Sequence, residues 1–417
     1  MAQGLHVCSE IGRLRTVMLH RPGEELLNLS PDNLSPLLFD DIPFLQVAQQ
    51  EHDTFEHMLR DQGVQVLYLE DLVTEALDAS AGAREEFTDQ WLRECNATGK
   101  RVLGAVRERL NAIEDTSEFV RKTCEGVRAD ELDLTPSQAS SLADLVSIGG
   151  DYSGALVVDP IPNTYFTRDD FTIIGRGVSI NRMHTYTRRR ETLYGEFIFR
   201  HHPVYGGAPR WYDRSLPYHI EGGDILILNA NTLAVGMSER TEPAAIDLLA
   251  HEILMRSETS GIEHIYAFSI PHKRTFMHLD TVFTQVDVDT FTVHPGILGT
   301  LRVYELTRGR GRGDVRIRQM EGDLDQILAR ALGLPAVRLI KCGGGDVIAA
   351  AREQWNDGSN TLAVEPGKVF VYQRNSVTND ILYKAGIELL EVPSAELSRG
   401  RGGPHCMSMP FWRDDLA

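Results

Sequence analysis

Hairpin-like β patterns recur along the sequence from about residue 154 onward, separated by helical patterns. Paired apolar stretches joined by turn residues occur in ALVVDPIPNTYFTRDDFTIIGRGVSI, GGDILILNANTLAVGM, MHLDTVFTQVDVDTFTVHP and GGGDVIAAAREQWNDGSNTLAVEPGKVFVYQRN. Helical periodicity lies between them at residues 243–256, 323–332 and 377–385, with Gly386 as the expected C-cap of the last helix. A strand–hairpin–helix–strand unit that recurs at irregular spacing predicts a cyclic, propeller-like α/β arrangement.

The N-terminal part begins with the same signals and then changes character. LRTVMLHRPG predicts a strand ending at a Pro-Gly turn, a helix follows from about residue 43 to Gly63, and VQVLYLEDL predicts a second strand. Beyond it the charge density rises, and apolar residues recur at helical spacing in two stripes. The stripes are Phe87, Trp91, Leu92 and Cys95, and Val102, Val106, Leu110 and Ile113. We therefore expect an inserted α-helical subdomain at 77–148 and an α/β body made of 1–76 and 149–417.

Composition and charge exclude several classes of protein. The 417 residues are 42% hydrophobic and 24% charged, so the chain can bury a sizeable core. The net charge of −18 makes it a poor general binder of nucleic acid or anionic membrane, and its field attracts a small cation. The cysteines are odd in number, scattered and without a Cys-x-x-Cys pair, as is typical of reduced thiols. Without a signal-peptide pattern or a bilayer-length apolar stretch, we expect a cytoplasmic protein.

Four of the β-segments carry compact polar clusters. These are NTYFTRD at 163–169, HIEGGD at 219–224, MHLDT at 277–281 and GGPHC at 402–406. His278 and Asp280 are two residues apart, so on a strand both side chains would face one ligand. Glu221 and Asp224 flank two glycines that permit a close approach. Turn chemistry or a solvated strand face explains any one cluster, but the four together indicate a site.

Cys406 follows the stretch RGRGG. A lone cysteine is more often a small buried hydrophobe, but glycines and basic residues here favour an exposed thiolate that a distant histidine would assist. A zinc site is the alternative, although no HExxH or paired Cys/His spacing supports it. A phosphate loop, a Rossmann fingerprint and a GxSxG elbow are all missing. The triplet Arg188-Arg189-Arg190 is typical of solvated surface or of an anion-binding arginine.

Six motifs in order give the chain a family resemblance. They are LLFDDIPF at 37–44, NTYFTRD, IEGGD, MHLDTVFT, REQWNDGSN at 352–360 and ELSRGRGGPHCMSMP at 396–410. Across nearly its whole length the chain resembles arginine deiminases of the guanidino-group modifying superfamily. The resemblance implies a five-fold pseudosymmetric α/β propeller with an inserted helical bundle. It also implies hydrolysis of L-arginine to L-citrulline and ammonia, no metal or organic cofactor, and a homodimer or larger homo-oligomer.

The same resemblance assigns roles to individual residues. Cys406 is expected to attack the guanidinium carbon and form a covalent thiouronium. His278 is expected to act as general acid and then as general base, oriented by Glu221, while Asp169 and Asp280 hold the guanidinium. The expected substrate-binding residues are Asn163, Phe166, Arg188, Asp224, Arg240 and Arg401. Of these, Arg188 and Arg240 would bind the α-carboxylate, and Arg401 would be a mobile gate.

This chemistry is physically consistent. A buried guanidinium stays charged, so it needs opposed carboxylates. Its resonance makes the carbon a poor electrophile, and a thiolate divides the hydrolysis into two easier steps. Because a free thiol has a pKa of about 8.5, nearby cations or the substrate itself must assist its ionisation.

Alternatives and departures remain at this stage. An amidinotransferase, another guanidine hydrolase such as agmatine deiminase, and a non-catalytic binding protein with the same fold would share most of these features. Asp170 stands where many members have Pro or a small polar residue, and it would either shift local pKa values or face solvent. His405 stands where some members have arginine, and it would couple activity to mildly acidic pH.

Overall fold

The computed structural model describes residues 4–148, 155–271, 276–299, 301–311 and 313–416, and the protein is of the mixed α/β class. Within these ranges the strands form five sheets and one separate two-stranded pair. None of the described helices is both long and apolar enough to cross a membrane.

The five sheets share one pairing pattern. In each, two strands pair antiparallel, and one of the two is also parallel to a third strand. Two further strands extend one sheet antiparallel. The sheets are β19 (Met409–Arg413), β1 (Leu14–Leu19) and β2 (Gln65–Tyr68); β5 (Phe171–Ile174), β6 (Gly177–Ile180) and β7 (Arg210–Tyr212); β8 (Ile225–Asn229), β9 (Thr232–Met237), β10 (His264–Ser269), β13 (Arg302–Arg308) and β14 (Val315–Met320); β11 (Phe283–Asp287), β12 (Thr290–Val293) and β15 (Arg338–Lys341); and β16 (Leu362–Glu365), β17 (Lys368–Tyr372) and β18 (Glu388–Val392).

Helices follow the sheets in chain order, and local chemistry fixes their ends. They are α1 (Leu45–Asp61), α7 (Glu191–His201), α8 (Pro243–Met255), α9 (Ser257–Ser260), α10 (Leu324–Leu332), α11 (Val347–Trp355) and α12 (Ser376–Lys384). Pro243 begins α8, where its missing N–H has no intrahelical partner to lose. Gly386 follows α12 with φ of 93°, a conformation that glycine adopts without steric cost. The three helices predicted between the hairpins and the one predicted before Gly63 are thereby confirmed.

One local prediction is wrong, and one helix is absent from the predictions. The strand predicted for VQVLYLEDL ends at Tyr68, because Leu69 already begins a helix. The hairpin predicted in GGGDVIAAAREQWNDGSNTLAVEPGKVFVYQRN is formed by β16 and β17, but the first part of this stretch contains α11, which was not predicted from the sequence. Asp346 caps this helix by accepting a hydrogen bond from the backbone N–H of Ala349 at 2.7 Å. Short apolar runs do not by themselves distinguish a strand from a helix.

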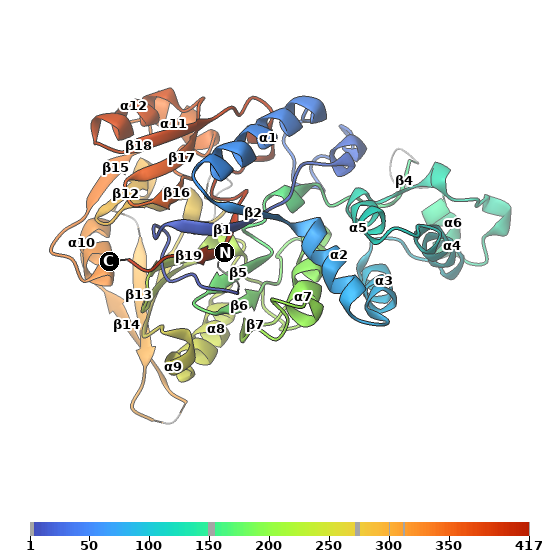
Figure 1. Ribbon diagram of the computed structural model, residues 1–417, viewed down its shortest axis with the longest axis horizontal. Helices are drawn as coiled ribbons and strands as arrows, with labels where there is room; N and C mark the ends of the chain where they lie inside the picture. The colour runs from blue at the N-terminus through green and yellow to red at the C-terminus, as the bar shows by residue number, and fades with distance from the viewer. Residues whose placement is uncertain (1–3, 149–154, 272–275, 300, 312, 417) are drawn as a thin grey trace.

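A group of helices extends to one side of the sheets (Figure 1). It consists of α2 (Leu69–Ala79), α3 (Ala83–Glu94), α4 (Lys100–Asn111), α5 (Thr116–Glu125) and α6 (Leu142–Ile148), with the short pair β3 (Val127–Arg128) and β4 (Leu156–Val158). All eight residues of the two predicted apolar stripes are buried. The helical character predicted for this stretch is therefore confirmed.

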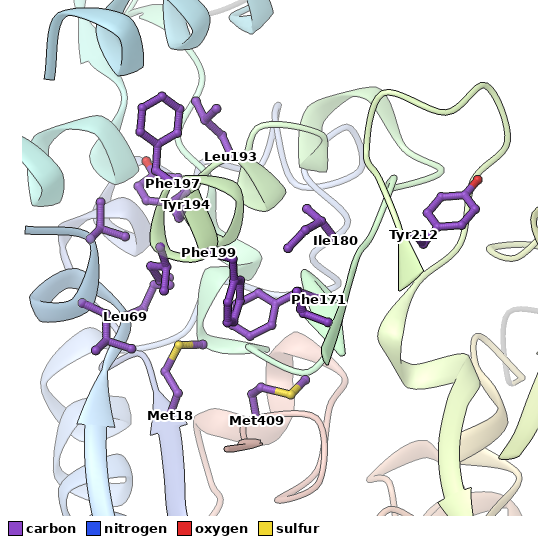
Figure 2. Close-up of a cluster of buried hydrophobic side chains, with 14 of the residues drawn as sticks. Met18, Leu69, Phe171, Ile180, Leu193, Tyr194, Phe197, Phe199, Tyr212 and Met409 are labelled. Carbon is purple, nitrogen blue, oxygen red and sulfur yellow. The ribbon is translucent and has the colours of Figure 1, made fainter. Parts of the chain in front are cut away.

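A continuous apolar core joins these helices to the sheets. Phe87 of α3 makes edge-to-face contacts with Phe119, Tyr194 and Phe197, at centroid distances between 5.1 and 5.9 Å. The cluster continues to Phe171 of β5, and Figure 2 shows α7 side chains between the helical part and the strands. The helices are therefore anchored on α7.

Replacing Phe87 with alanine tests this anchoring. We expect Phe87→Ala to lower the free energy of unfolding by about 3–5 kcal/mol, because the fully buried ring leaves a cavity. Chemical denaturation measures the change. Tyr383→Ala, which removes a ring that is 72% exposed, is the matched control and is expected to change stability by less than about 0.5 kcal/mol. Equal effects of the two replacements would contradict the assignment.

Candidate active site

A cavity of about 250 Å³ collects most of the residues expected from the sequence. Eight of the eleven lie on its wall: Asn163, Phe166, Asp169, Arg188, Arg240, His278, Arg401 and Cys406. The other three, Glu221, Asp224 and Asp280, are fully buried beside it. Segments far apart in the sequence thus meet at one place.

Tight turns at strand ends present these side chains. Glu221 immediately precedes the 3-10 turn Gly222–Asp224, which leads into β8. His278 precedes the turn Leu279–Thr281, which leads into β11. The prediction that His278 and Asp280 share one strand face is therefore wrong, because Asp280 lies within the turn. The turn instead directs the two side chains to different partners.

The glycines of IEGGD are sterically required. A Cβ on Gly222 would lie 1.9 Å from the carbonyl oxygen of Arg168, and one on Gly223 would lie 2.7 Å from Nδ1 of His278. The close approach predicted for this turn is an approach of protein groups. It allows the imidazole to lie directly against the backbone.

His278 is held between two carboxylates. Its Nε2 lies 2.7 Å from Oε2 of Glu221, and its Nδ1 lies 3.7 Å from Oδ1 of Asp169. Burial alone would lower the pKa of His278, but the charge of Asp169 and the hydrogen bond to Glu221 raise it to about 9. Burial would raise the pKa of Glu221, yet Arg240 and His278 hold it well below its usual value. The pair is therefore an imidazolium and a carboxylate near neutral pH.

Cys406 lies beside Asp280. Its Sγ is 3.4 Å from Oδ2 of Asp280, and its backbone N–H donates to Oδ1 of Asn360 at 3.1 Å. Burial raises the pKa of the Cys406 thiol well above its usual value, and the carboxylates of Asp280 and Asp169 raise it further. The exposed thiolate favoured by the sequence is not present, because the cysteine is buried and faces negative charge. An arriving cation would reverse this effect.

Removing the charge of Asp280 is expected to lower the thiol pKa. Asp280→Asn keeps the shape of the side chain but removes the negative charge next to Sγ. The pH dependence of Cys406 alkylation, followed by peptide mass spectrometry without substrate, should shift to lower pH. Asp130→Asn, at a fully exposed carboxylate, is the control and should leave the profile unchanged. An unchanged or upward shift in Asp280→Asn would contradict the electrostatic account.

Arg188 contacts an unexpected partner. Its Nη1 lies 2.9 Å from Oδ2 of Asp169, and its Nη2 lies 2.8 Å from Oε2 of Glu191. A guanidinium of the protein therefore rests on the carboxylate that is expected to hold the guanidinium of the substrate. Arg240, the other expected carboxylate ligand, lies 3.5 Å from Glu221 and also faces the cavity.

Arg401 lies on the wall of the cavity and is buried. Its guanidinium carbon is 3.6 Å from the ring centroid of Trp355, and its Nη1 is 3.3 Å from Oδ2 of Asp40. Its φ of 66° is uncommon for a residue with a side chain, and Leu38 on the same cavity wall has φ of 65°. Both of these residues, each with a left-handed backbone conformation, therefore line the cavity.

The remaining expected substrate ligands differ in what they contact. Asn163 donates to the carbonyl of Leu37 at 2.8 Å, and Phe166 stacks on Tyr165 at 4.0 Å. Asp224 does not line the cavity but accepts the backbone N–H of Leu279 at 2.9 Å. Burial raises the pKa of Asp224 to about 7. It supports the turn next to His278.

The structure also links His405 to Glu10, a residue to which no role was assigned from the sequence. His405 bridges two carboxylates, with Nδ1 2.9 Å from Asp280 and Nε2 3.1 Å from Glu10. Burial would raise the pKa of Glu10, but the hydrogen bond from His405 and the charge of Arg168 hold it at about 2. Glu10 lies almost a full chain length from His405, so only the fold reveals the contact. Its one sequence signal is a carboxylate in the segment SEIG.

Asp170 does not face solvent. It is buried, and burial together with the neighbouring Glu191 raises its pKa well above the usual value. Burial also raises the pKa of Glu191 to about 7. Of the two possibilities for Asp170, an orientation toward solvent is wrong, because the side chain is buried beside Glu191.

Asp169, Glu221 and His278 have ligand atoms close enough to hold a metal ion, and so do His6, Cys8 and Asp415 away from the cavity. Arg188 and Arg240 already offer positive charge to the carboxylates of the first group. A protonated imidazole is no metal ligand. We therefore expect full turnover after chelation and dialysis, measured against a metal-reconstituted sample. Loss of turnover that zinc restores would establish a metal site.

Comparison with known proteins identifies the family of the chain. The family model for arginine deiminase matches residues 35–413. The arginine deiminases of Treponema denticola and Streptococcus sanguinis are each 52% identical to the chain over 99% of its length and 99% of theirs. Among solved structures, an amidinotransferase from Microseira wollei is similar with a TM-score of 0.54 and 14% identity, covering 99% of this chain and 98% of that one.

A dimethylarginine dimethylaminohydrolase is similar with a TM-score of 0.52 and 14% identity, covering 95% of this chain and all of that one. At these identities the two solved structures show a common fold and nothing more. The full-length match to the family model and to relatives with half of their residues identical is of another kind. By that match the chain belongs to the arginine deiminase family.

Proposed function

We propose that this protein hydrolyses L-arginine to L-citrulline and ammonia. The observation that carries the proposal is the cavity lined by Cys406, His278 and Asp169, with the carboxylate of Asp280 buried next to Sγ of Cys406. A planar cation between the two aspartates would bring its central carbon next to the sulfur. Family membership supports the same activity.

The first half-reaction follows from the charges around Cys406. A bound guanidinium offsets the two carboxylates that keep the thiol protonated, so the substrate itself favours the thiolate, and the thiol releases its proton to solvent. The thiolate adds to the guanidinium carbon, and a C–S bond forms. His278, protonated at rest, gives its proton to one terminal nitrogen. The C–N bond then breaks, ammonia leaves, and a thiouronium remains on Cys406.

The second half-reaction uses the neutral His278 that the first one leaves. It removes a proton from water, and the resulting hydroxide adds to the thiouronium carbon. The C–S bond breaks, the new hydroxyl group loses its proton to solvent to give citrulline, and Cys406 returns as a thiolate that takes up a proton once the product leaves. Glu221, bonded to Nε2, keeps the imidazole oriented through both proton transfers.

Substrate binding requires Arg188 to exchange partners. Arg188 rests on Asp169, so an incoming guanidinium competes for that carboxylate. We propose that Arg188 then turns to the α-carboxylate, together with Arg240, while Asn163 and Phe166 line the amino-acid end. Arg401 closes the mouth from its position over Trp355. Asp224 stabilises the turn that follows His278 by accepting the backbone N–H of Leu279.

Product analysis tests the proposed reaction. Metal-free enzyme incubated with L-arginine should release equal amounts of citrulline and ammonia, and it should give no product from agmatine, which lacks the α-carboxylate. Transfer of the amidino group to an added amine, without ammonia, would establish an amidinotransferase instead. The absence of any product would leave a binding protein with this fold.

Arg240 provides a sharper test of carboxylate recognition. Arg240→Gln is expected to raise KM for arginine about 10- to 100-fold, because a charge-assisted hydrogen bond contributes about 1.5–3 kcal/mol. Steady-state kinetics with arginine and with agmatine give kcat/KM for each substrate. The preference of the variant for arginine over agmatine should be smaller than that of the unchanged protein. Arg128→Gln, at an exposed arginine, is the control. A KM unchanged in Arg240→Gln would contradict this role.

The architecture and assembly belong to the same proposal. Five sheets with one pairing pattern support a five-fold α/β propeller. We propose that residues 1–76 and 149–417 form this catalytic propeller, into which the helical segment 77–148 is inserted. We also propose a cytoplasmic homodimer or larger homo-oligomer. Light scattering of the purified protein tests the assembly.

A further inference from the structure

A second cavity lies where the helical part meets the sheets, and the proposed reaction does not use it. It has a volume of about 330 Å³. Its lining combines α3 residues with residues around β6, α7 and β7, namely Gln90, Arg93, Glu94, Arg182, Met183, Tyr186, Arg189, Thr192, Glu196, Asp213, Arg214 and Ser215. We call this cavity the arginine pocket because four of its lining residues are arginines.

The carboxylates of the arginine pocket already have cationic partners. Arg214 binds both Glu94 and Glu196, the latter at 3.2 Å. Asp213 lies 2.9 Å from Arg210, a residue that does not line the pocket. The three acids of the pocket are therefore matched within the protein.

Three arginines of the pocket have no such match. Among the ion pairs of the described residues, none includes Arg93, Arg182 or Arg189. Arg182 donates to the carbonyl of Arg214 at 3.1 Å, which leaves its charge uncompensated. The Nε of Arg189 is buried without a hydrogen-bond partner in the described structure. Such a group is costly unless something occupies the space in front of it.

Arg182 and Arg189 also act on each other. Burial lowers the pKa of the Arg189 guanidinium, and the nearby positive charge of Arg182 lowers it further. The guanidinium carbon of Arg189 lies 5.7 Å from the ring centroid of Tyr186, which also lines the pocket. The charge of Glu94 opposes this lowering of the pKa, but Glu94 is ion-paired with Arg214. Two neighbouring guanidiniums without an ion pair of their own among the described residues offer a site for an anion, since their planar donor forks match an oxyanion.

We propose that the arginine pocket binds a small oxyanion, a phosphate or carboxylate group, between Arg182 and Arg189 with Arg93 at its edge. The volume exceeds the ~30 Å³ share of one water molecule many times, so an organic anion fits as well as an inorganic one. The net charge of −18 opposes general anion binding, so an anion held here is held by local groups.

The three consecutive arginines Arg188, Arg189 and Arg190 lie in three different environments. Arg188 faces the active-site cavity, Arg189 faces the arginine pocket, and Arg190 lies over Trp91 at 5.1 Å. An oxyanion bound to Arg189 would therefore contact the residue that directly follows Arg188 of the active-site cavity. The sequence alternative of solvated surface does not describe this triplet, because Arg188 and Arg190 are buried.

Titration calorimetry on the full chain tests the proposal at constant ionic strength. Inorganic phosphate and citrate are titrated separately, which distinguishes the phosphate from the carboxylate source. We expect saturable binding of at least one of them, weakened about tenfold or more in Arg189→Gln and in Arg182→Gln, equivalent to about 1.4 kcal/mol each. Arg318→Gln, at an exposed arginine of β14, is the matched control and should bind like the unchanged protein.

Two results would overturn the proposal. One is the lack of saturable binding of either anion. The other is equal affinity in Arg189→Gln, Arg182→Gln and Arg318→Gln, which would place the anion elsewhere, for instance at Arg188 and Arg240. Circular dichroism on each variant checks folding first. If Arg189→Gln fails to fold, Arg182→Gln alone decides between the outcomes.

Discussion

Cys406→Ser is expected to lower kcat for arginine hydrolysis by about 10⁴-fold or more, with the fold retained. A serine hydroxyl ionises far less readily than a thiol, and the carboxylates of Asp280 and Asp169 already oppose ionisation at this position. The bound guanidinium can compensate for a thiol but not for a hydroxyl. Citrulline production over hours measures kcat, and thermal unfolding checks that stability is unchanged.

Cys8→Ser is the matched control, because Cys8 is a half-buried thiol outside the cavity. It should turn over arginine like the unchanged protein. Turnover by Cys406→Ser within tenfold of normal would remove Cys406 from the mechanism. Intact-mass measurement during turnover should show a thiouronium adduct in the unchanged protein and none in Cys406→Ser.

His278→Gln is expected to lower kcat by about 10³-fold or more, since general acid–base catalysis typically contributes about 10²–10⁴-fold to each step it serves. The side chain serves both half-reactions, first as the imidazolium and then as the neutral base. Glutamine keeps hydrogen-bonding groups of similar reach toward Glu221 but transfers no proton. Single-turnover kinetics between pH 5 and 9 should lose the dependence that His278 imposes.

His264→Gln supplies the control, because His264 also faces a carboxylate, Glu305 at 3.0 Å, but lies on β10 away from the cavity. Its kcat should stay normal. A pH profile that is unchanged in His278→Gln, or a loss of less than tenfold, would show that another group moves the protons.

The sequence predicted those parts of the fold that depend on short-range patterns. Apolar residues that recur with a period of two indicate strands of hairpins, and a period of 3.6 indicates amphipathic helices. The second pattern predicts α8, α10 and α12. The helix α11 was missed because its apolar run is short and its cap, Asp346, resembles an ordinary turn residue. The pairing of the sheets was suggested only as a repeat, since register depends on residues distant in the chain.

The site was predictable to a similar extent. Compact motifs pointed to Cys406 and His278, and the cavity brings them together. The link from Asp280 through His405 to Glu10 was not predictable, because nothing local distinguishes Glu10 from a surface carboxylate. Nor does any spacing rule reveal that Arg188 rests on Asp169. Ion pairs form between groups that the fold brings together, whereas a motif describes only residues that are adjacent in the sequence.

The pairing of β1 with β19 has a consequence for biosynthesis. Met18 of β1 lies opposite Met409 of β19, only a few residues beyond Cys406. The ribosome synthesises β1 near the start of translation and β19 near its end. Domains generally fold as their segments emerge from the ribosome. A nascent chain can therefore form α1 and most hairpins early, but it cannot hydrolyse arginine. During elongation β1 also lacks its antiparallel neighbour, so the hydrogen-bonding groups along this edge stay unpaired until β19 is synthesised.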